Sequence, residues 1–368
     1  MNQLPNITKN FALEGEVKST GLYGNGHINE THLCITEDAA GKERWYILQK
    51  INKRVFKDPA GLMNNYALVT EHLRKNIIAR GGDALRETLT LVKTVEGKNF
   101  YEDESGEFWR ATLFIVDSLS FDKVENPEQF YQSGVAFGNF QALLRDFPAH
   151  LLVETIVNFH NTPDRFRQFK EALAADIKGR AASVKEEIAF VEAREGFMHL
   201  FEDAYAAGKL PLRVTHNDTK LNNILFDKHT GKPVCIIDLD TIMPGYAIND
   251  FGDSIRFGAT TALEDETDLS KVNFDISLFE LYVKGFLEGA AGGLSEAEIA
   301  YLPESAIMMT LECGARFLTD HLQGDTYFRT SRENHNLDRA RNQFKLVSDM
   351  ERALPEMHKI VEKYAKQY

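Results

Sequence analysis

Hydrophobic side chains in the first third of the chain follow the two-residue period of β-strands. Residues 29–36 and 45–51 alternate or cluster apolar side chains over strand length, and Gly41-Lys42 lies between them as a turn. A second hairpin is predicted further on, with Ser105-Gly106 as its turn and residues 108–116 as its second strand. This pattern predicts a β-rich N-terminal region.

A helix interrupts these strands. Asp58 and Pro59 predict its N-cap and first residue, and it extends to about residue 75. One face of it repeats apolar side chains at helical spacing: Leu62, Tyr66, Val69 and Leu73.

Beyond residue 117 the pattern is mostly helical. Helix-period apolar residues occur in residues 127–145, 164–207, 274–289, 295–322 and 337–366. The exception is a short hairpin with strands at 223–226 and 234–237. We therefore predict an α+β protein of two lobes, a β-rich lobe of residues 1–117 and a mainly helical lobe of residues 118–368.

The composition narrows the class of protein. The 368 residues carry a formal net charge of −13, with no basic stripe of the kind that binds nucleic acid. Cys34, Cys235 and Cys313 are far apart, so neither a disulfide framework nor a zinc site is predicted. No apolar run approaches the roughly 18 residues that span a bilayer, and the N-terminus lacks an apolar targeting core. We expect a cytoplasmic protein with no membrane partner.

One spacing points to phosphoryl transfer from ATP. The pattern His-x-Asp-x4-Asn occurs at His216, Asp218 and Asn223, and an apolar strand ending in Asp238 follows; residues 216–223 are called the catalytic loop below. A carboxylate in such a loop can accept the proton of an acceptor hydroxyl, and two hard oxygen ligands can hold Mg²⁺. Alone, Asp218 equally fits a turn cap and Asp238 a strand-end turn. Their shared spacing favours Asp218 as the base and Asn223 with Asp238 as the metal site.

Four further polar residues are predicted to support this site. His216 is expected to brace the loop rather than to carry a proton, because Asp218 already serves as the base. Asp240 follows Asp238 by two residues, on the same face of an extended chain, and is a candidate to contact a second ion or the substrate. One carboxylate of Asp250 and Asp253 is expected to brace the catalytic loop, although both residues also suit a capped helix start.

A glycine-rich segment is the candidate phosphate loop. Gly24, Asn25 and Gly26 would let backbone N–H groups approach phosphate oxygens, although the same pattern makes ordinary hairpin turns. On the next strand, Gln49 and Lys50 point to opposite faces, so only one of them can face the nucleotide. Kinases usually place a lysine here. If Gln49 faces the nucleotide, the usual ammonium group is missing or comes from elsewhere.

The motifs resemble those of the aminoglycoside phosphotransferase–choline kinase superfamily, whose signature is His-x-Asp-x4-Asn followed by Ile-Asp. Here the signature is carried by His216, Asp218, Asn223 and Ile237-Asp238. The resemblance implies a protein-kinase-like fold of the aminoglycoside phosphotransferase type. It also implies ATP as co-substrate and Mg²⁺ as cofactor.

A closer likeness, to the bacterial N-acetylhexosamine 1-kinases, extends over nearly the whole chain. It is carried by residues 23–29, 46–49, 214–225, 236–245, 250–254, 256–259, 317–318, 324–325 and 327–328. Members of that family phosphorylate the anomeric hydroxyl of N-acetylglucosamine and N-acetylgalactosamine. The resemblance implies the same activity and a small-molecule sugar substrate for this chain.

The same resemblance implies which side chains line the sugar pocket: His27, Asp218, Phe257, Arg316 and Tyr327. From spacing alone, Arg316 and Asp320 lie four residues apart on a helix and would form a surface ion pair instead. Gln49 matches the family as well, so the missing lysine does not argue against activity.

Two other functions stay open. A kinase of this fold that acts on an amino alcohol or an aminoglycoside needs a pocket rich in carboxylates or aromatic rings, and Arg316 matches such a cation poorly. A non-catalytic nucleotide-binding regulator is suggested by Gln49 and opposed by the intact Asp218, Asn223 and Asp238. The sequence does not rank the two N-acetylhexosamines, and it leaves the oligomeric state open, a monomer included.

Overall fold

The computed structural model describes residues 4–24 and 28–368, and the chain forms two compact units. The first unit comprises Met1–Leu119, Asp146–Val157 and Leu225–Pro244, and the second comprises Ser120–Arg145, Asn158–Ile224 and Gly245–Tyr368. The first unit therefore takes in two segments that lie beyond residue 117, the predicted lobe boundary.

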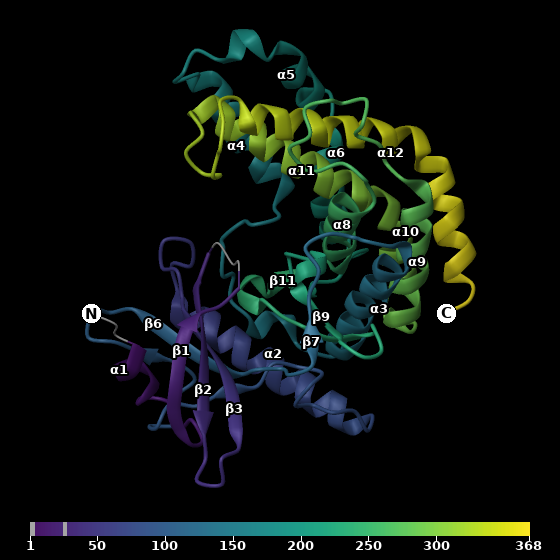
Figure 1. Ribbon diagram of the computed structural model, residues 1–368. Helices are drawn as coiled ribbons and strands as arrows, with labels where there is room; N and C mark the ends of the chain where they lie inside the picture. The colour runs from purple at the N-terminus through teal and green to yellow at the C-terminus, as the bar shows by residue number, and fades with distance from the viewer. Residues whose placement is uncertain (1–3, 25–27) are drawn as a thin grey trace. The chain divides into compact units, whose positions relative to one another are not determined.

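The first unit is built on an antiparallel sheet with the strand order β1-β2-β3-β6-β4, and β5 pairs with β6. Figure 1 shows β1, β2 and β3 of this sheet side by side. Its strands are β1 (Glu16–Leu22), β2 (Glu30–Glu37), β3 (Glu43–Lys50), β4 (Leu91–Val92), β5 (Tyr101–Glu102) and β6 (Phe108–Leu113). Side chains alternate between the faces of a strand, so Cys34, Tyr46 and Leu48 enter one core. Leu4 of the short helix α1 (Leu4–Thr8) packs against them.

The strand predicted at 108–116 is too long, because β6 ends at Leu113. Asp117 adopts a left-handed backbone with φ of 52°, and the Ser118 hydroxyl donates to the carbonyl of Ile115 at 2.6 Å. These two features turn the chain away from the sheet. The other predicted strands of this region agree with β2 and β3 to within a residue or two.

Helix α2 (Pro59–Ala79) begins where the sequence predicts and runs four residues further. The Asp58 carboxylate caps it by accepting from the backbone N–H of Gly61 at 2.9 Å. The predicted apolar face is confirmed as buried: Leu62, Tyr66, Val69 and Leu73.

The predicted short hairpin is confirmed as β9 (Ile224–Asp227) and β10 (Pro233–Ile236), and β7 (Ser118–Leu119) pairs with β9. Asp238 follows β10 and is the N-cap of the 3₁₀ turn η4 (Leu239–Thr241). The chain then continues into β11 (Met243–Gly245). A further 3₁₀ turn, η1, covers Ala149–Leu151.

The second unit is mainly helical. Its helices are α3 (Pro127–Leu144), α4 (Thr162–Ala175), α5 (Lys185–Glu192), α6 (Glu195–Met198), α7 (Leu200–Ala206), α8 (Ala247–Gly258), α9 (Ile276–Ala290), α10 (Glu296–Ala300), α11 (Leu302–Gln323) and α12 (His335–Ala365). It also contains β8 (Arg213–Thr215) and the 3₁₀ turns η2 (Ala181–Ser183) and η3 (Leu221–Asn223).

Two of the predicted long helices are divided. The segment 164–207 is not one helix, because α4 ends at Asp176 in a left-handed C-cap and Gly179 has φ of 65°. The segment 295–322 is divided at Tyr301 into α10 and α11. Pro303 sits in the first turn of α11, where its missing N–H group costs nothing, but it cannot continue a preceding helix.

No helix in the described part of the chain is long and apolar enough to cross a membrane.

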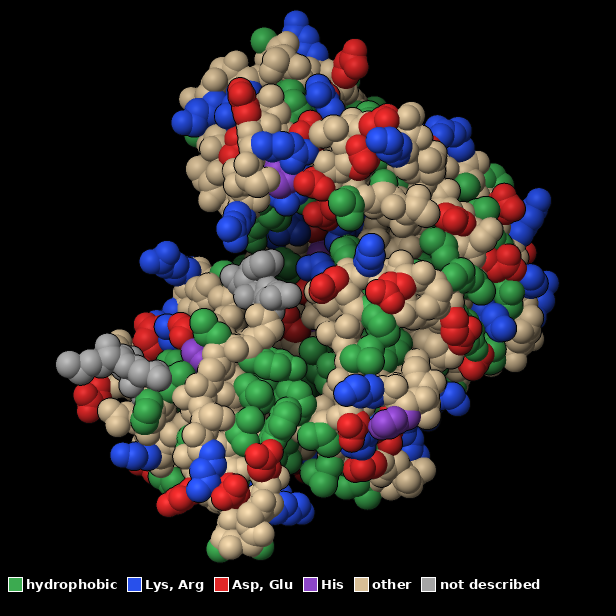
Figure 2. Space-filling view, in the orientation of Figure 1, with side chains coloured by type: hydrophobic (Ala, Val, Ile, Leu, Met, Phe, Trp, Pro, Cys, Tyr) green, Lys and Arg blue, Asp and Glu red, His purple; other side chains and the backbone are tan. Residues whose placement is uncertain are grey.

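On the face drawn in Figure 2, acidic and basic side chains are interspersed over the surface.

Helices α3 and α9 approach each other through glycines. A Cβ atom built on Gly138 of α3 would lie 2.1 Å from the carbonyl oxygen of Phe286, and one on Gly285 of α9 would lie 2.2 Å from that of Tyr131. Gly134 and Gly289 repeat this arrangement one turn away. The missing side chains let the two backbones touch, and this contact fixes the position of α3. Gln141 of α3 in turn bonds Asp250, which holds the catalytic loop.

Replacing Gly138 with Ala should therefore destabilise the protein by about 1–3 kcal/mol, since an added methyl group in a closed contact forces the helices apart. Urea unfolding followed by circular dichroism measures this loss. Gly196→Ala is the matched control, because a Cβ atom there meets nothing within 4 Å. Equal stability of Gly138→Ala and wild type would contradict the close approach.

Candidate active site

The catalytic loop leaves β8 and passes through η3 before β9. Val214 and Thr215 at the end of β8 are fully buried, which gives the loop a fixed starting point. Asn217 has φ of 65°, in the left-handed region that Asn tolerates better than most residues. Along this turn His216 is buried, whereas the Asp218 side chain is 28% exposed. The loop therefore has a fixed starting point and one accessible carboxylate, that of Asp218.

Asp250 of α8 holds the catalytic loop through hydrogen bonds to its backbone. One of its oxygens accepts from the backbone N–H of His216 and from the Gln141 side chain, both at 2.9 Å. The other accepts from the backbone N–H of Asn217 at 2.8 Å. Burial raises the pKa of Asp250, although the backbone hydrogen bonds from His216 and Asn217 oppose the rise. The carboxylate supplies the acceptors that the buried N–H groups of the turn require.

Asp253, almost one turn further along α8, holds the next part of the loop. Its Oδ2 accepts from the backbone N–H of Thr219 at 3.1 Å, and its Oδ1 pairs with Nε of Arg256 at 2.9 Å. Arg256 also pairs with Glu264 at 2.7 Å. Burial alone would raise the pKa of Asp253, but the charges of Arg256 and Lys220 outweigh it and hold the pKa below its ordinary value.

His216 lies among aromatic rings. Phe137 and Phe140 of α3 meet its imidazole edge-on, with ring centroids 5.7 and 6.0 Å away. Its Nδ1 accepts from the backbone N–H of Asp218 at 3.3 Å. These contacts tie the ring to the loop that it belongs to.

The Asp218 carboxylate is held from both sides within the loop. Lys220 Nζ pairs with its Oδ1 at 2.7 Å, and Asn223 Nδ2 donates to its Oδ2 at 3.0 Å. Burial alone would lower the pKa of Lys220, but the charge and hydrogen bond of Asp218 raise it. Lys220 had no role in the sequence-based prediction. Its place two residues after Asp218, within the motif, was the available signal.

The predicted phosphate loop is described only in part. Gly24 is exposed and has φ of 74°, a conformation that favours glycine. The predicted phosphate-loop residues Asn25 and Gly26 and the predicted pocket residue His27 lie outside the described residues.

On β3, Gln49 and Lys50 take opposite faces, as the alternation requires. Lys50 pairs with Glu30 at 2.7 Å. Gln49 accepts two hydrogen bonds from the buried guanidinium of Arg110, at 2.9 and 2.7 Å. Arg110 is a second polar residue that the sequence-based prediction missed, and the signal was a lone charge in the middle of β6.

Asp238 and Asp240 do not share a face, contrary to the expectation for an extended chain. Asp238 has φ of 59° and ψ of 58°, and the chain then enters the tight turn η4. As a result Asp238 is exposed, whereas only 3% of the Asp240 side chain is exposed. Asp240 pairs with Arg110 and accepts a hydrogen bond from Asn29.

The chemistry of the two predicted metal ligands suits Mg²⁺. The Asn223 amide nitrogen donates to Asp218, which leaves the amide oxygen as a hard ligand atom, and Asp238 adds an exposed carboxylate. Mg²⁺ takes one or two such ligands and fills its remaining positions with water and phosphate oxygens. Among the described residues, no three His, Cys, Asp or Glu side chains are grouped so that they form a metal cage without substrate.

Arg316 of α11 lies among three aromatic rings of the second unit. Its guanidinium is 5.3, 5.9 and 5.5 Å from the rings of Phe159, Tyr327 and Phe328. The structure thus brings together Arg316 and Tyr327, two of the predicted pocket residues, and Tyr327 is 65% exposed. Phe257, a third, is half-buried near the end of α8.

The ion pair predicted from spacing between Arg316 and Asp320 is wrong. Arg316 instead approaches Glu312, one turn earlier, at 3.9 Å. Asp320 is buried and accepts from the backbone N–H groups of Tyr327 and Phe328 at 2.8 and 2.9 Å. An acceptor is needed there because the loop after α11 exposes backbone donors.

Two buried polar atoms beside Arg316 have no hydrogen-bond partner among the described residues. Glu312 Oε1 bonds His160 Nδ1 at 2.8 Å, but Glu312 Oε2 and His160 Nε2 are both unpaired. Burial alone would raise the pKa of Glu312, but the charges of His160, Arg316 and Arg165 hold it below its ordinary value. Buried polar atoms are normally satisfied, so these two are free to bind water or a ligand.

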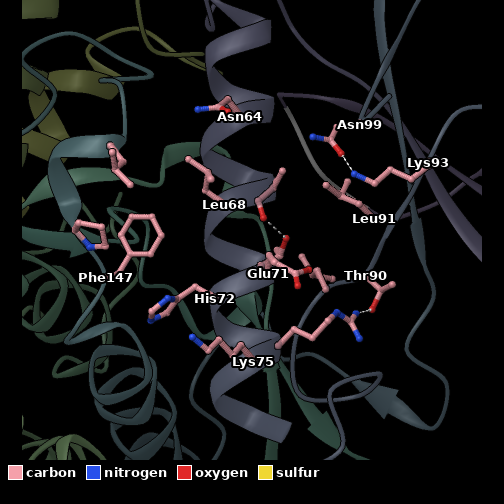
Figure 3. A pocket seen from close by; sticks show the side chains of 16 residues that line it. Asn64, Leu68, Glu71, His72, Lys75, Thr90, Leu91, Lys93, Asn99 and Phe147 are labelled. Atoms are coloured by element: carbon pink, nitrogen blue, oxygen red, sulfur yellow. Dashed lines mark hydrogen bonds between the residues drawn. The ribbon is translucent and has the colours of Figure 1, made fainter. Parts of the chain in front are cut away.

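A cavity of about 740 Å³ runs along α2 in the first unit (Figure 3). Leu68, Leu91 and Phe147 supply apolar lining. The side chains of Arg74 and Lys93 donate to Thr90 and Asn99 respectively, so both cations already have partners within the cavity wall.

A family model described as a phosphotransferase enzyme family matches residues 83–277, more than half of the chain. The matched span includes Arg110 and the whole catalytic loop, and it extends past Asp238, Asp250 and Asp253.

Solved structures resemble the chain over nearly its full length. A microcompartment-associated aminopropanol kinase has a TM-score of 0.65 at 16% identity, covering 96% of this chain and 98% of that one. An aminoglycoside phosphotransferase from Alicyclobacillus acidocaldarius subsp. acidocaldarius has a TM-score of 0.63 at 14% identity, covering 98% and 96%. Amicoumacin kinase hAmiN, in complex with AMP-PNP, Ca²⁺ and Ami, has a TM-score of 0.57 at 13% identity, covering 94% and 93%. At these identities the likeness shows the fold, and the predicted α+β kinase-like fold is confirmed.

Because the pKa of Asp253 is lowered in the folded state, its ionised form stabilises the protein. This stabilisation is fully present above the unfolded pKa of about 3.9 and is lost as the pH falls through the lower folded pKa. Asp253→Asn should therefore lower the free energy of unfolding by about 2 kcal/mol at pH 7, and the difference from wild type should shrink near pH 3. Denaturant titrations at the two pH values measure it. The exposed Asp122→Asn is the control, and a difference independent of pH would contradict the ionised pair.

Proposed function

We propose an activity for this chain, which belongs to the phosphotransferase enzyme family: transfer of the γ-phosphate of ATP to the anomeric hydroxyl of an N-acetylhexosamine. The first part of the proposal is a small-molecule kinase reaction. The second part is the identity of the acceptor as an N-acetylhexosamine, and it depends on the surroundings of Arg316.

The arrangement of Asp218 carries the kinase part. A partly exposed carboxylate is held between Lys220 and Asn223, on a loop whose backbone is tied to Asp250 and Asp253. A carboxylate fixed in this way can orient a hydroxyl group in line with a phosphoryl group, and orientation supplies much of the rate in phosphoryl transfer.

Asp218 is the proposed base. It accepts the proton of the sugar hydroxyl late in the transfer, and the ion pair with Lys220 fixes its direction. An anomeric hydroxyl is more acidic than an ordinary alcohol because the ring oxygen withdraws electron density, so a carboxylate base suffices. Asn223 and Asp238 would hold Mg²⁺, which when bound offsets the negative charge of the phosphates.

The surroundings of Arg316 support a neutral sugar as the acceptor. Three aromatic rings offer apolar faces, while Arg316, Glu312 and His160 offer hydrogen-bonding groups, of which two buried atoms are unpaired. Polyhydroxylated rings combine apolar faces with many donors and acceptors, which such a wall complements. The two guanidinium groups of Arg165 and Arg316 act on the single carboxylate of Glu312, so the surroundings of Arg316 repel a cationic acceptor.

A second candidate acceptor is an amino alcohol or an aminoglycoside. The unpaired Glu312 Oε2 favours it, because a carboxylate oxygen would pair with an ammonium group. The names of two structural neighbours, an aminopropanol kinase and an aminoglycoside phosphotransferase, point the same way.

Incubation with Mg·ATP and one acceptor at a time distinguishes these candidates. We expect product with N-acetylglucosamine or N-acetylgalactosamine and none with choline or kanamycin, because the wall around Arg316 favours a neutral ring. ³¹P NMR gives the readout, in which a phosphorus signal coupled to an anomeric proton identifies the 1-phosphate. Product with choline or kanamycin alone would move the function to the second candidate. No product with any acceptor, together with retained Mg·ATP binding, would favour a nucleotide-binding regulator.

Asp218→Asn should lower turnover by about 10²–10⁴-fold, because the amide cannot accept the proton. Mg·ADP affinity should stay within a few-fold of wild type, because the nucleotide does not depend on this carboxylate in the proposed mechanism. Coupled-enzyme kinetics and calorimetry measure the two quantities. Asp122→Asn should leave both unchanged, and turnover that survives Asp218→Asn would rule out Asp218 as the base.

A further inference from the structure

Three polar side chains form a row across the sheet of the first unit. Thr31 of β2 stands opposite Gln49 of β3, which stands opposite Arg110 of β6. Residues directly opposite in an antiparallel pair project from the same face. The Gln49 amide nitrogen donates to the Thr31 hydroxyl at 3.1 Å, and its amide oxygen accepts from Nε and Nη2 of Arg110. Gln49 thus connects a hydroxyl on one side to a guanidinium on the other.

The far end of the row is a buried ion pair. Nη1 of Arg110 bonds Oδ1 of Asp240, and the two side chains are 1% and 3% exposed. The Tyr66 ring lies under the guanidinium at 4.6 Å. Asn29 donates to Oδ2 of Asp240, and the Asn29 oxygen accepts from the backbone N–H of Asn52 at 2.9 Å. Both oxygens of Asp240 are therefore engaged within the protein.

This ion pair restrains the turn that carries Asp238. Asp240 lies within η4, and Asp238 is the N-cap of the same turn. Burial alone would lower the pKa of Arg110, but the charges of Asp240, Tyr66 and Asp238 raise it, which places Asp238 within electrostatic reach of the guanidinium. Loss of one partner of a buried ion pair leaves an uncompensated charge, so Arg110 and Asp240 hold each other firmly.

We propose that Gln49, Arg110 and Asp240 form a positioning relay that aims Asp238. In this arrangement Asp240 is the counter-ion of Arg110 and not a metal ligand, and Gln49 directs the guanidinium instead of contacting the nucleotide. Arg110 is then the fixed cation of this sheet, and it holds a carboxylate of the protein, whereas the β3 lysine of other kinases contacts phosphates. The inference rests on the proposed function only in taking Asp238 as a ligand of Mg²⁺.

The opposite face of the same strands provides a matched comparison. There Glu30, Lys50 and Trp109 form the corresponding row, with Lys50 paired to Glu30 and lying 5.8 Å from the Trp109 ring. Lys50 is one residue from Gln49 but reaches none of the relay groups. A change at Lys50 therefore alters the charge of the strand without touching the relay.

Gln49→Lys tests the role of Gln49. If Gln49 merely occupied the place of a nucleotide-binding lysine, this change would preserve or raise ADP affinity. In the relay, the new ammonium removes the acceptor of Arg110 and repels it, so Mg·ADP affinity should fall at least tenfold. Calorimetric titrations of ADP with and without Mg²⁺ give the readout, and the metal-free affinity should change much less. Lys50→Gln should match wild type in both titrations.

A charge-removal cycle tests Asp240. Arg110→Met should weaken Mg·ADP binding at least tenfold, because Asp240 is left buried without a partner. Adding Asp240→Asn removes that charge and should restore most of the loss. If Asp240 ligates the metal, Asp240→Asn alone will abolish the Mg²⁺-dependent part of ADP binding and the double variant will recover nothing, which overturns the proposal. Because Arg110→Met alone can impair folding, Gln49→Met, which keeps the ion pair with Asp240, is measured beside it, and we expect a smaller loss of Mg·ADP affinity and a smaller drop in thermal midpoint.

These titrations contain no sugar, so they separate the relay from the proposed function. A protein that binds Mg·ADP but phosphorylates no acceptor would refute the proposed kinase reaction while leaving the relay test intact. A Gln49→Lys protein that binds Mg·ADP as tightly as wild type would refute the relay whatever the acceptor.

Discussion

One constraint shapes the second unit. The left-handed turn at Asn217 leaves buried backbone N–H groups, and these groups need hydrogen-bond acceptors. Asn217 departs from ordinary backbone geometry, and the N–H groups of His216 and Asn217 then point into a space that water does not reach. The Asp250 carboxylate meets both donors from α8. Because Asp250 is itself fully buried, its position is fixed by α8 and by Gln141 of α3. The close approach of α3 and α9 through glycines thus bears on the loop that presents Asp218.

The first unit uses the same principle with the opposite sign of charge. Arg110 is buried in the sheet, and its N–H groups are met by Gln49 and Asp240. In the second unit the buried carboxylate of Asp250 bonds the backbone of the catalytic loop, and in the first unit the buried guanidinium of Arg110 bonds the side chain of Asp240 within η4. The accessible carboxylates, Asp218 and Asp238, are one residue from Asn217 and two residues from Asp240, the residues held in this way. A reactive side chain can then be exposed without being loosely held.

Local patterns in the sequence predicted most of the fold. The cap at Asp58, the apolar face of α2 and the hairpin of β9 and β10 follow from short-range rules, and the structure confirms them. The divided helices were missed because a helical period continues across Asp176 and Tyr301, where a left-handed residue and the approach of Pro303 break the hydrogen-bond ladder.

The predicted site depended on spacing, and spacing has limits. It grouped Asp218 with Asn223, and the loop brings these two side chains within hydrogen-bond distance. It put Asp238 and Asp240 on one face because it assumed an extended chain, whereas Asp238 is left-handed. It paired Arg316 with Asp320 by helical periodicity, but Asp320 instead accepts hydrogen bonds from backbone N–H groups that follow α11. For Arg110 the sequence offered only a lone charge within a strand, because its partners Gln49 and Asp240 are distant in the chain and meet it only in the folded protein.

The charges around these groups bear on how a nucleotide would be held. Lys220 pairs with Asp218, Arg256 with Asp253 and Glu264, and Arg110 with Asp240. Each of these cations is neutralised by a carboxylate of the protein, so none of them brings surplus positive charge to a triphosphate. In the proposed reaction that charge has to come from Mg²⁺ and from backbone N–H groups. The protein's cations then serve chiefly to aim carboxylates, and a chain with a net charge of −13 can still bind an anionic substrate.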